Sequence, residues 1–204
     1  MGRYREEWMG PQKCGIAASG FVSAGLALSV SIAAAAEIKS LDLKDDRVEL
    51  SISGSIAPGD ADLLKARIKE ANDAGKLVTS LRLNSDGGNL LEAVRIADAV
   101  KFAKLSTNVG RSATCASACF LIFAAGEAKY ANNSARIGVH GASDKDVRSS
   151  RAATTSMADI AKALDVPSPI IRRMVNTPPG EVEWLSLADL RSMGANISRV
   201  EPER

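Results

Sequence analysis

The sequence predicts an α/β fold in which helices cover a mostly parallel β-sheet. Short stretches alternate apolar and polar residues, as half-buried strands do. Between them lie longer segments whose apolar residues recur every three or four positions, the period of a helix packed on a core. Strands that alternate with helices predict repeated strand–helix units and a largely parallel sheet. The composition, 46% hydrophobic and 25% charged, is that of an ordinary globular protein.

The first half of the predicted fold contains two strand–helix pairs. Residues 47–53 alternate apolar and polar, which predicts a half-buried strand. Asp60 is a suitable N-cap for the next helix, because its carboxylate can accept hydrogen bonds from the first free backbone N–H groups, and Gly75 ends that helix. The elements that follow are a strand at 77–83, a tight turn at 84–88 and a mostly buried helix at 89–100.

The second half of the predicted fold consists of shorter elements. The expected strands lie at 107–110, 129–131, 136–139 and 195–200, and the expected helices at 117–125, 153–164, 168–175 and 187–193. Residues 144–151 are polar and predict a surface loop, whereas residues 178–180, Pro-Pro-Gly, break the chain. Neither an internal repeat nor a long linker divides the sequence, so a single domain over residues 37–204 is expected.

The first 36 residues have the pattern of a secretory signal peptide. Basic residues come first, the stretch from Gly15 to Ala36 carries no charge, and Ala34 and Ala36 fit an A-x-A cleavage site. We therefore expect cleavage after Ala36 and a periplasmic or secreted protein. A retained membrane anchor is the alternative, because an apolar stretch of this length can span a bilayer. Translation from Met9 would give a more typical basic region than translation from Met1.

Charge and histidine content exclude several functional classes. Lys+Arg is 26 and Asp+Glu is 24, so no basic excess indicates nucleic acid as a partner. The sole histidine, His140, excludes a metal site that needs two or three imidazoles. The turn at 84–89 lacks the Gly-Lys-Ser/Thr of a Walker loop and the spacing of a dinucleotide fingerprint. We expect no metal and no cofactor.

Two turns that enter helices carry residues suited to chemistry. Gly87 and Gly88 let backbone N–H groups point outward at a helix start, which suits an oxyanion or a phosphate. Ser117 stands at the start of another helix, where a serine is often only an N-cap. A serine nucleophile needs an imidazole within hydrogen-bond reach, and His140 ends a strand further along the chain.

The order of these features resembles the ClpP/crotonase superfamily, and within it the proteolytic subunit of Clp protease and its secreted relatives. The turn Asn-Ser-Asp-Gly-Gly at 84–88 is similar to the family's Asn-Ser-Pro-Gly-Gly, and residues 116–126 align without a gap with its nucleophile helix. The segments at 133–140 and 184–194 echo two further family motifs. The resemblance covers about residues 47–200, and it implies β-β-α units, peptidase activity and a homo-oligomer.

The resemblance implies a role for each site residue. Ser117 would attack a carbonyl, and His140 would take the serine proton and later give it to the leaving amine. The N–H groups of Ala118 and Gly88 would form the oxyanion hole, with Gly87 as the fallback for the second donor.

Two departures from the family pattern affect this site. The position of the family's triad aspartate is Val182, which cannot orient an imidazole. Other polar side chains are candidates for that role: Glu181, Glu183, Asn176, Asp144 and Asp146. Asp86 replaces the family's proline and puts a negative charge near the expected oxyanion.

Cys115 and Cys119 flank Ser117 at two residues on either side. An even pair of cysteines in an oxidising compartment predicts a disulfide, and the geometry permits it if Cys115 precedes the helix. The alternative is two buried small apolar side chains.

Together these observations predict a periplasmic or secreted Clp-like serine hydrolase that cleaves peptide bonds without ATP. Its expected substrates are short peptides, unfolded proteins or fragments of membrane proteins, and an uncleaved signal would attach it to a membrane. The missing acid motivates the alternative, a weak or inactive relative that serves as a binding module. A crotonase-type acyl-CoA enzyme is disfavoured, because coenzyme A is cytosolic whereas the leader predicts export.

Overall fold

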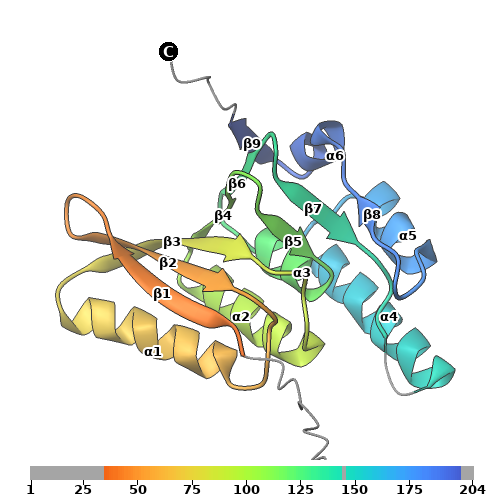
Figure 1. Cartoon of the computed structure of the whole chain (residues 1–204), viewed down its shortest axis with the longest axis horizontal. Coiled ribbons are helices and arrows are strands. Elements are labelled where there is room, and N and C mark those ends of the chain that lie inside the picture. Colours follow the sequence, from red (N-terminus) through yellow and green to blue (C-terminus); the bar gives the residue numbers. More distant parts are fainter. Residues whose placement is uncertain (1–34, 144–145, 199–204) are drawn as a thin grey trace, which may run out of the picture. The chain divides into compact units, whose positions relative to one another are not determined.

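The centre of the fold is a six-stranded, mostly parallel sheet (Figure 1). The computed structural model describes residues 35–143 and 146–198. The strands are β1 (Glu37–Asp42), β2 (Arg47–Ser53), β3 (Leu77–Asn84), β4 (Ser106–Val109), β6 (Lys129–Asn132) and β9 (Ala195–Ser198). They are ordered β1-β2-β3-β4-β6-β9, and only β1 runs antiparallel to its neighbour. The predicted α/β class with a mostly parallel sheet is confirmed.

Helices pack against the sheets and against one another because each of them has an apolar face to bury. The helices of the described part are α1 (Asp60–Asp73), α2 (Leu90–Phe102), α3 (Ala118–Ala124), α4 (Val147–Ala163), α5 (Ser168–Asn176) and α6 (Leu187–Ser192). α1 and α2 run side by side along β1, β2 and β3 (Figure 1). Leu64 of α1 and Ile96 of α2 are fully buried in the core that the sheet residues Leu50 and Leu81 share.

A second, three-stranded sheet carries the turn that contains Ser117. It consists of β5 (Thr114–Ala116), β7 (Arg136–Val139) and β8 (Glu183–Trp184), with β5 parallel and β8 antiparallel to β7. Ser85 joins the two sheets, because its N–H donates to Thr114 O at 2.8 Å and its carbonyl accepts from Ala116 N at 3.1 Å. The end of β3 is thereby held against β5.

α3 is the central helix of the core. All seven of its residues are buried, and Phe120 and Phe123 are among the largest side chains that are fully buried. The Thr107 hydroxyl of β4 donates to Phe123 O at 2.8 Å near the end of this helix. Such complete burial explains why the segment contains only small and apolar residues.

Several local predictions are wrong. Residues 147–151 were predicted as loop but form the first turns of α4, which the Asp146 carboxylate caps. Most of their side chains are polar because this end of the helix is largely exposed. Residues 144–145 of the predicted loop lie outside the described part. Asp60 is the first helical residue of α1, and Gly59 holds the cap position instead. Strands β1, β5 and β8 were not predicted, since β1 buries only Ile38 and the other two are very short.

The predicted signal peptide lies, except for Ala35 and Ala36, outside the described residues, so it stays a prediction. Ala35 is exposed, whereas Ala36 is buried beside the start of β1. Among the described residues, no helix is both long and apolar enough to cross a membrane.

We predict that Phe120→Ala lowers the free energy of unfolding by about 3–5 kcal/mol, because the substitution leaves a cavity in the core. Phe102→Ala is the matched control: the Phe102 side chain is 92% exposed, and its loss should cost less than about 0.5 kcal/mol. Urea unfolding of both oxidised variants measures the difference. Equal losses would contradict the assignment of α3 as the centre of the core.

Candidate active site

Ser117 lies in a sharp turn between β5 and α3. Its φ of 55° and ψ of −125° are rarely adopted by a residue with a side chain. Its N–H donates to Gly138 O of β7 at 3.2 Å, and its side chain makes no capping hydrogen bond to α3. The simple N-cap interpretation of Ser117 is therefore not supported. A strained strand-to-helix turn is also how α/β-hydrolases expose a nucleophilic serine hydroxyl.

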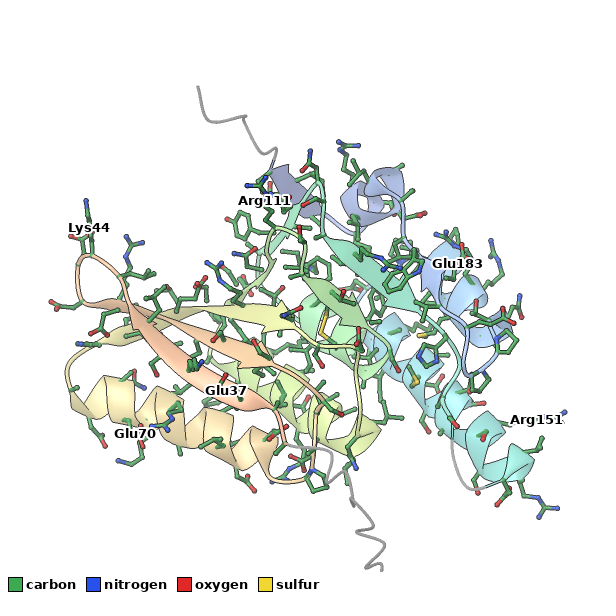
Figure 2. All side chains as sticks on the ribbon, viewed as in Figure 1. Glu37, Lys44, Glu70, Arg111, Arg151 and Glu183 are labelled. Carbon is green, nitrogen blue, oxygen red and sulfur yellow. A yellow bond between two sulfur atoms is a disulfide. The ribbon has the colours of Figure 1, made fainter. Side chains whose placement is uncertain are left out.

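A disulfide between Cys115 and Cys119 brackets this turn. The two Cα atoms are 5.2 Å apart, and both residues are fully buried. Figure 2 shows the bridge as the yellow bond beside β5 and α3. The predicted disulfide is thus present in the structure. It ties the end of β5 to the first turn of α3 and so restricts the backbone of Ser117 and Ala118.

The Gly87-Gly88 turn packs directly against the Ser117 turn. A Cβ on Gly87 would lie 2.7 Å from Ser117 Cβ, and one on Gly88 would lie 2.3 Å from Ile56 O. Both residues also have positive φ values, of 107° and 139°. Only glycine fits at these two positions, because a side chain at Gly87 would collide with the Ser117 turn and one at Gly88 would collide with the backbone of Ile56.

The two glycines differ in whether the N–H group is available. Gly87 N–H donates to Ser85 Oγ at 3.1 Å. Neither Gly88 N–H nor Ala118 N–H has a hydrogen-bond partner among the described residues. Of the two glycines, Gly88 is therefore the one whose N–H remains free to bind an oxyanion together with that of Ala118.

His140 follows β7 and is half-buried, and its Nδ1 lies 2.7 Å from Gly141 O. A carbonyl oxygen can only accept a hydrogen bond, so Nδ1 carries the proton and Nε2 is the basic nitrogen. Gly141 is itself held, because its N–H donates to Thr177 O at 2.9 Å. The neighbouring N–H of Ala142 donates to Thr154 Oγ1, also at 2.9 Å. This imidazole has the tautomer that a general base needs.

Ser117, Ala118, His140 and Gly88 all line one cavity of about 650 Å³. The remaining lining residues, from α2, α4 and the segments that precede them, are mostly apolar: Asn89, Leu90, Leu91, Val94, Ala142, Ser143, Ala153, Ser156, Met157 and Ile160. Ser117 and His140 do not hydrogen-bond to each other here. Catalytic hydrogen bonds often tighten only when substrate binds.

None of the described candidates for the third catalytic residue bonds to His140. Glu183 forms an ion pair with Arg173 at 3.4 Å and lies on β8, where Figure 2 labels it. Asp146 caps α4, and hydrogen bonds from the N–H and hydroxyl of Ser149 and the N–H of Arg148 hold the pKa of its carboxyl below the ordinary value. The remaining candidates are Glu181 and Asn176, which are exposed, and Asp144, which lies outside the described residues.

The backbone carbonyl of Gly141 thus occupies the place at Nδ1 that an acid was expected to fill. The sequence gives no signal for such a partner, because every residue has a carbonyl. Val182, at the position of the expected aspartate, packs toward Gly138 of β7 instead. The side chain of Asp86 is exposed. Within residues 35–143 and 146–198, no group of three or more His, Cys, Asp or Glu side chains could hold a metal ion.

In a comparison with protein-family models, residues 48–183 match the model of Clp protease. The chain belongs to the Clp protease family. A search of curated proteins found no match.

Solved structures confirm the Clp protease fold. ClpP1 from Listeria monocytogenes is 17% identical, with a TM-score of 0.58 over 75% of this chain and 92% of that one. A mutant of the same protein is 18% identical, with a TM-score of 0.59 over 74% and 91% of the two chains. A mutant of the 1510-N membrane-bound stomatin-specific protease is 14% identical, with a TM-score of 0.54 over 72% and 77%.

We predict that Gly87→Ala destabilises the protein by about 1–3 kcal/mol more than Gly180→Ala does. Both glycines have a φ near +100°, so both variants bear the same backbone strain. Only at Gly87 would the new Cβ collide with Ser117, because nothing lies within 4 Å of the corresponding position at Gly180. Urea unfolding of the two variants measures the difference. Equal destabilisation would show that the two turns are not in contact.

Proposed function

We propose that the protein is a serine peptidase of the Clp type, in which Ser117 is the nucleophile and His140 the general base. The observation that carries the proposal is the cavity lined by both residues together with two unpaired N–H groups, those of Gly88 and Ala118. Membership of the Clp protease family supports a peptidase activity. The rare backbone conformation of Ser117 supports its role as the nucleophile.

The proposed reaction has two stages. Nε2 of His140 takes the proton of Ser117 Oγ as this oxygen attacks the carbonyl carbon of a peptide bond. The N–H groups of Gly88 and Ala118 stabilise the negative oxygen of the tetrahedral intermediate. His140 then gives the proton to the leaving amine. Water, activated in the same way, hydrolyses the acyl-enzyme and frees Ser117.

Because His140 Nδ1 is held by a backbone carbonyl and not by a carboxylate, we expect a slow enzyme. Gly141 O holds the imidazole in the correct tautomer, but a neutral carbonyl stabilises the imidazolium of the transition state less than a carboxylate does. This same observation favours the second candidate function, a binding module that keeps the cavity but does not catalyse.

We also propose that the chain is exported and that it acts in the periplasm or outside the cell. The leader pattern supports this, and so does the disulfide, which persists in oxidising compartments. Substrates there would be short or unfolded peptides or fragments of membrane proteins, cleaved without ATP, and an uncleaved leader would attach the protein to a membrane. The family resemblance further suggests a homo-oligomer, for which light scattering after size-exclusion chromatography is the direct measurement.

We predict that a fluorophosphonate probe labels the purified, oxidised protein at Ser117. Ser117→Ala should abolish the labelling, and His140→Ala should slow it by about 10²-fold or more, because the serine loses its general base. Ser40→Ala, which removes an exposed serine on β1, should leave the labelling rate unchanged. A folded wild-type protein that is not labelled would instead support the binding module.

We further predict that Glu183→Gln and Glu181→Gln label as fast as the wild type, because Gly141 O contacts Nδ1 of His140 and, among the described residues, no carboxylate does. If either glutamate completes a triad during catalysis, its amide variant should be about 10⁴-fold slower, as expected when the orienting acid is lost. Labelling rates of the two variants, measured side by side, separate these outcomes. A decrease of that size would contradict the two-residue site.

A further inference from the structure

Asp60 is a buried carboxylate without a cation among the described residues. Its exposure is 2%, and it forms no ion pair in this part of the chain. Its Oδ2 accepts the N–H of Ala57 at 2.7 Å and the N–H of Ala36 at 3.4 Å. A charge removed from water in this way is costly unless it is paired.

The other two buried carboxylates of the described part each form an ion pair with an arginine. Among the described residues, Glu49 and Glu92 are also buried, at 7% and 4% exposure. Glu49 pairs with Arg82 at 2.7 Å, and Glu92 pairs with Arg95 at 2.8 Å. Asp60 is the most buried of the three carboxylates and has no such partner in the described part of the chain.

Among the described residues, one of the two backbone N–H groups that donate to Asp60 belongs to Ala36, where the chain enters the core. Ala35 is exposed and Ala36 is 5% exposed. Ala36 belongs to the hydrophobic core and packs beside Gly54, and Glu37, labelled in Figure 2, then begins β1. A peptide bond broken just before Ala36 would place a new amino group at the Asp60 carboxylate.

Two bonds in this stretch satisfy the small-residue rule of signal peptidases. Cleavage after Ala36 has alanines at 34 and 36, and cleavage after Ala35 has alanines at 33 and 35. The first would remove Ala36, a core residue whose N–H bonds to Asp60. The second keeps Ala36 in place and makes its nitrogen the chain terminus.

We propose that the mature protein begins at Ala36 and that its α-ammonium group forms an ion pair with Asp60. Water is added across the Ala35–Ala36 bond: Ala35 becomes a carboxylate, and the nitrogen of Ala36 becomes an amine. With an ordinary pKa near 8, this amine is mostly protonated at neutral pH, so the terminus supplies the missing cation. The inference rests on the proposed export but is independent of peptidase activity.

This ion pair lies within reach of the oxyanion turn. Ala57, whose N–H donates to Asp60, follows Ile56. Ile56 N–H donates to Gly87 O at 2.8 Å, and Ile56 O accepts from Asn89 N at 2.8 Å, so Ile56 clamps the turn that carries Gly88. The new terminus would therefore stabilise the loop that supports this turn.

The first test is the N-terminus of the exported protein. The full chain, expressed with its own leader in a bacterium and purified from the periplasm, is sequenced from its N-terminus. Ala36 as the first residue supports the proposal, and Glu37 as the first residue overturns it. An intact leader, or a cut elsewhere, overturns this proposal but not the proposed export, whereas a chain that never leaves the cytoplasm overturns both. None of these outcomes depends on whether the protein is an active peptidase.

The second test asks whether the terminus and Asp60 interact. The Tm of the processed protein is compared with that of the full-length oxidised chain, for the wild type, for Asp60→Asn and for Glu92→Gln. Removal of the leader at the Ala35–Ala36 bond should raise the Tm of the wild type by roughly 3–8 °C, because it creates the ion pair with Asp60. Asp60→Asn should abolish this gain, whereas Glu92→Gln, which removes a carboxylate already paired with Arg95, should keep it. The same gain in Asp60→Asn would overturn the ion pair.

If Asp60→Asn does not fold, the processed wild type gives an independent measurement. Acetylation of its α-amino group, at a pH where the lysines stay protonated, removes the terminal charge without a substitution. The acetylated protein should lose the gain in Tm, and an unchanged Tm would overturn the proposal.

Discussion

The close contact between two turns from different sheets determines the architecture around Ser117. Ser85 bonds to Thr114 and Ala116 and draws the end of β3 against β5. At that distance Gly87 cannot carry a side chain, and the backbone of Ile56 excludes one at Gly88. The contact also brings two unpaired N–H groups, from chain segments about thirty residues apart, to the same cavity.

Such a contact needs rigid support on both sides. Ile56 holds the glycine turn through backbone hydrogen bonds in both directions. The serine turn is held by the Cys115–Cys119 disulfide and by the N–H of Ser117, which donates to β7. Because α3 is buried along its whole length, the first turn of this helix cannot move without disturbing the core. The positive φ of Ser117 persists because these restraints act together.

The elements that could be predicted from the sequence are those whose buried face produces a regular spacing of apolar residues. Apolar and polar residues alternate along β2 and β3, and α2 has a wide apolar stripe. Each of these elements was therefore predicted near its observed place. β1 buries little besides Ile38, and α4 buries only Met157 and Ala161. The first residues of these two elements therefore lack a regular spacing of apolar residues that would predict a strand or a helix. The disulfide could be predicted from the even pair of cysteines and the expected oxidising compartment. The partner of His140 Nδ1 could not, because Gly141 supplies a backbone carbonyl.

The division of the site between two sheets has a consequence for the timing of activity. Gly88 belongs to the turn after β3, whereas Ser117 and His140 follow strands of the smaller sheet. A nascent chain that has synthesised only β1 to β3, α1 and α2 still lacks Ser117 and His140, the two reactive residues of the proposed site. The bond from Ser85 to β5, which aligns the donors, forms only after both sheets have docked. Under the proposed function, such a chain would be unable to cut its own unfolded copies until its folding is complete.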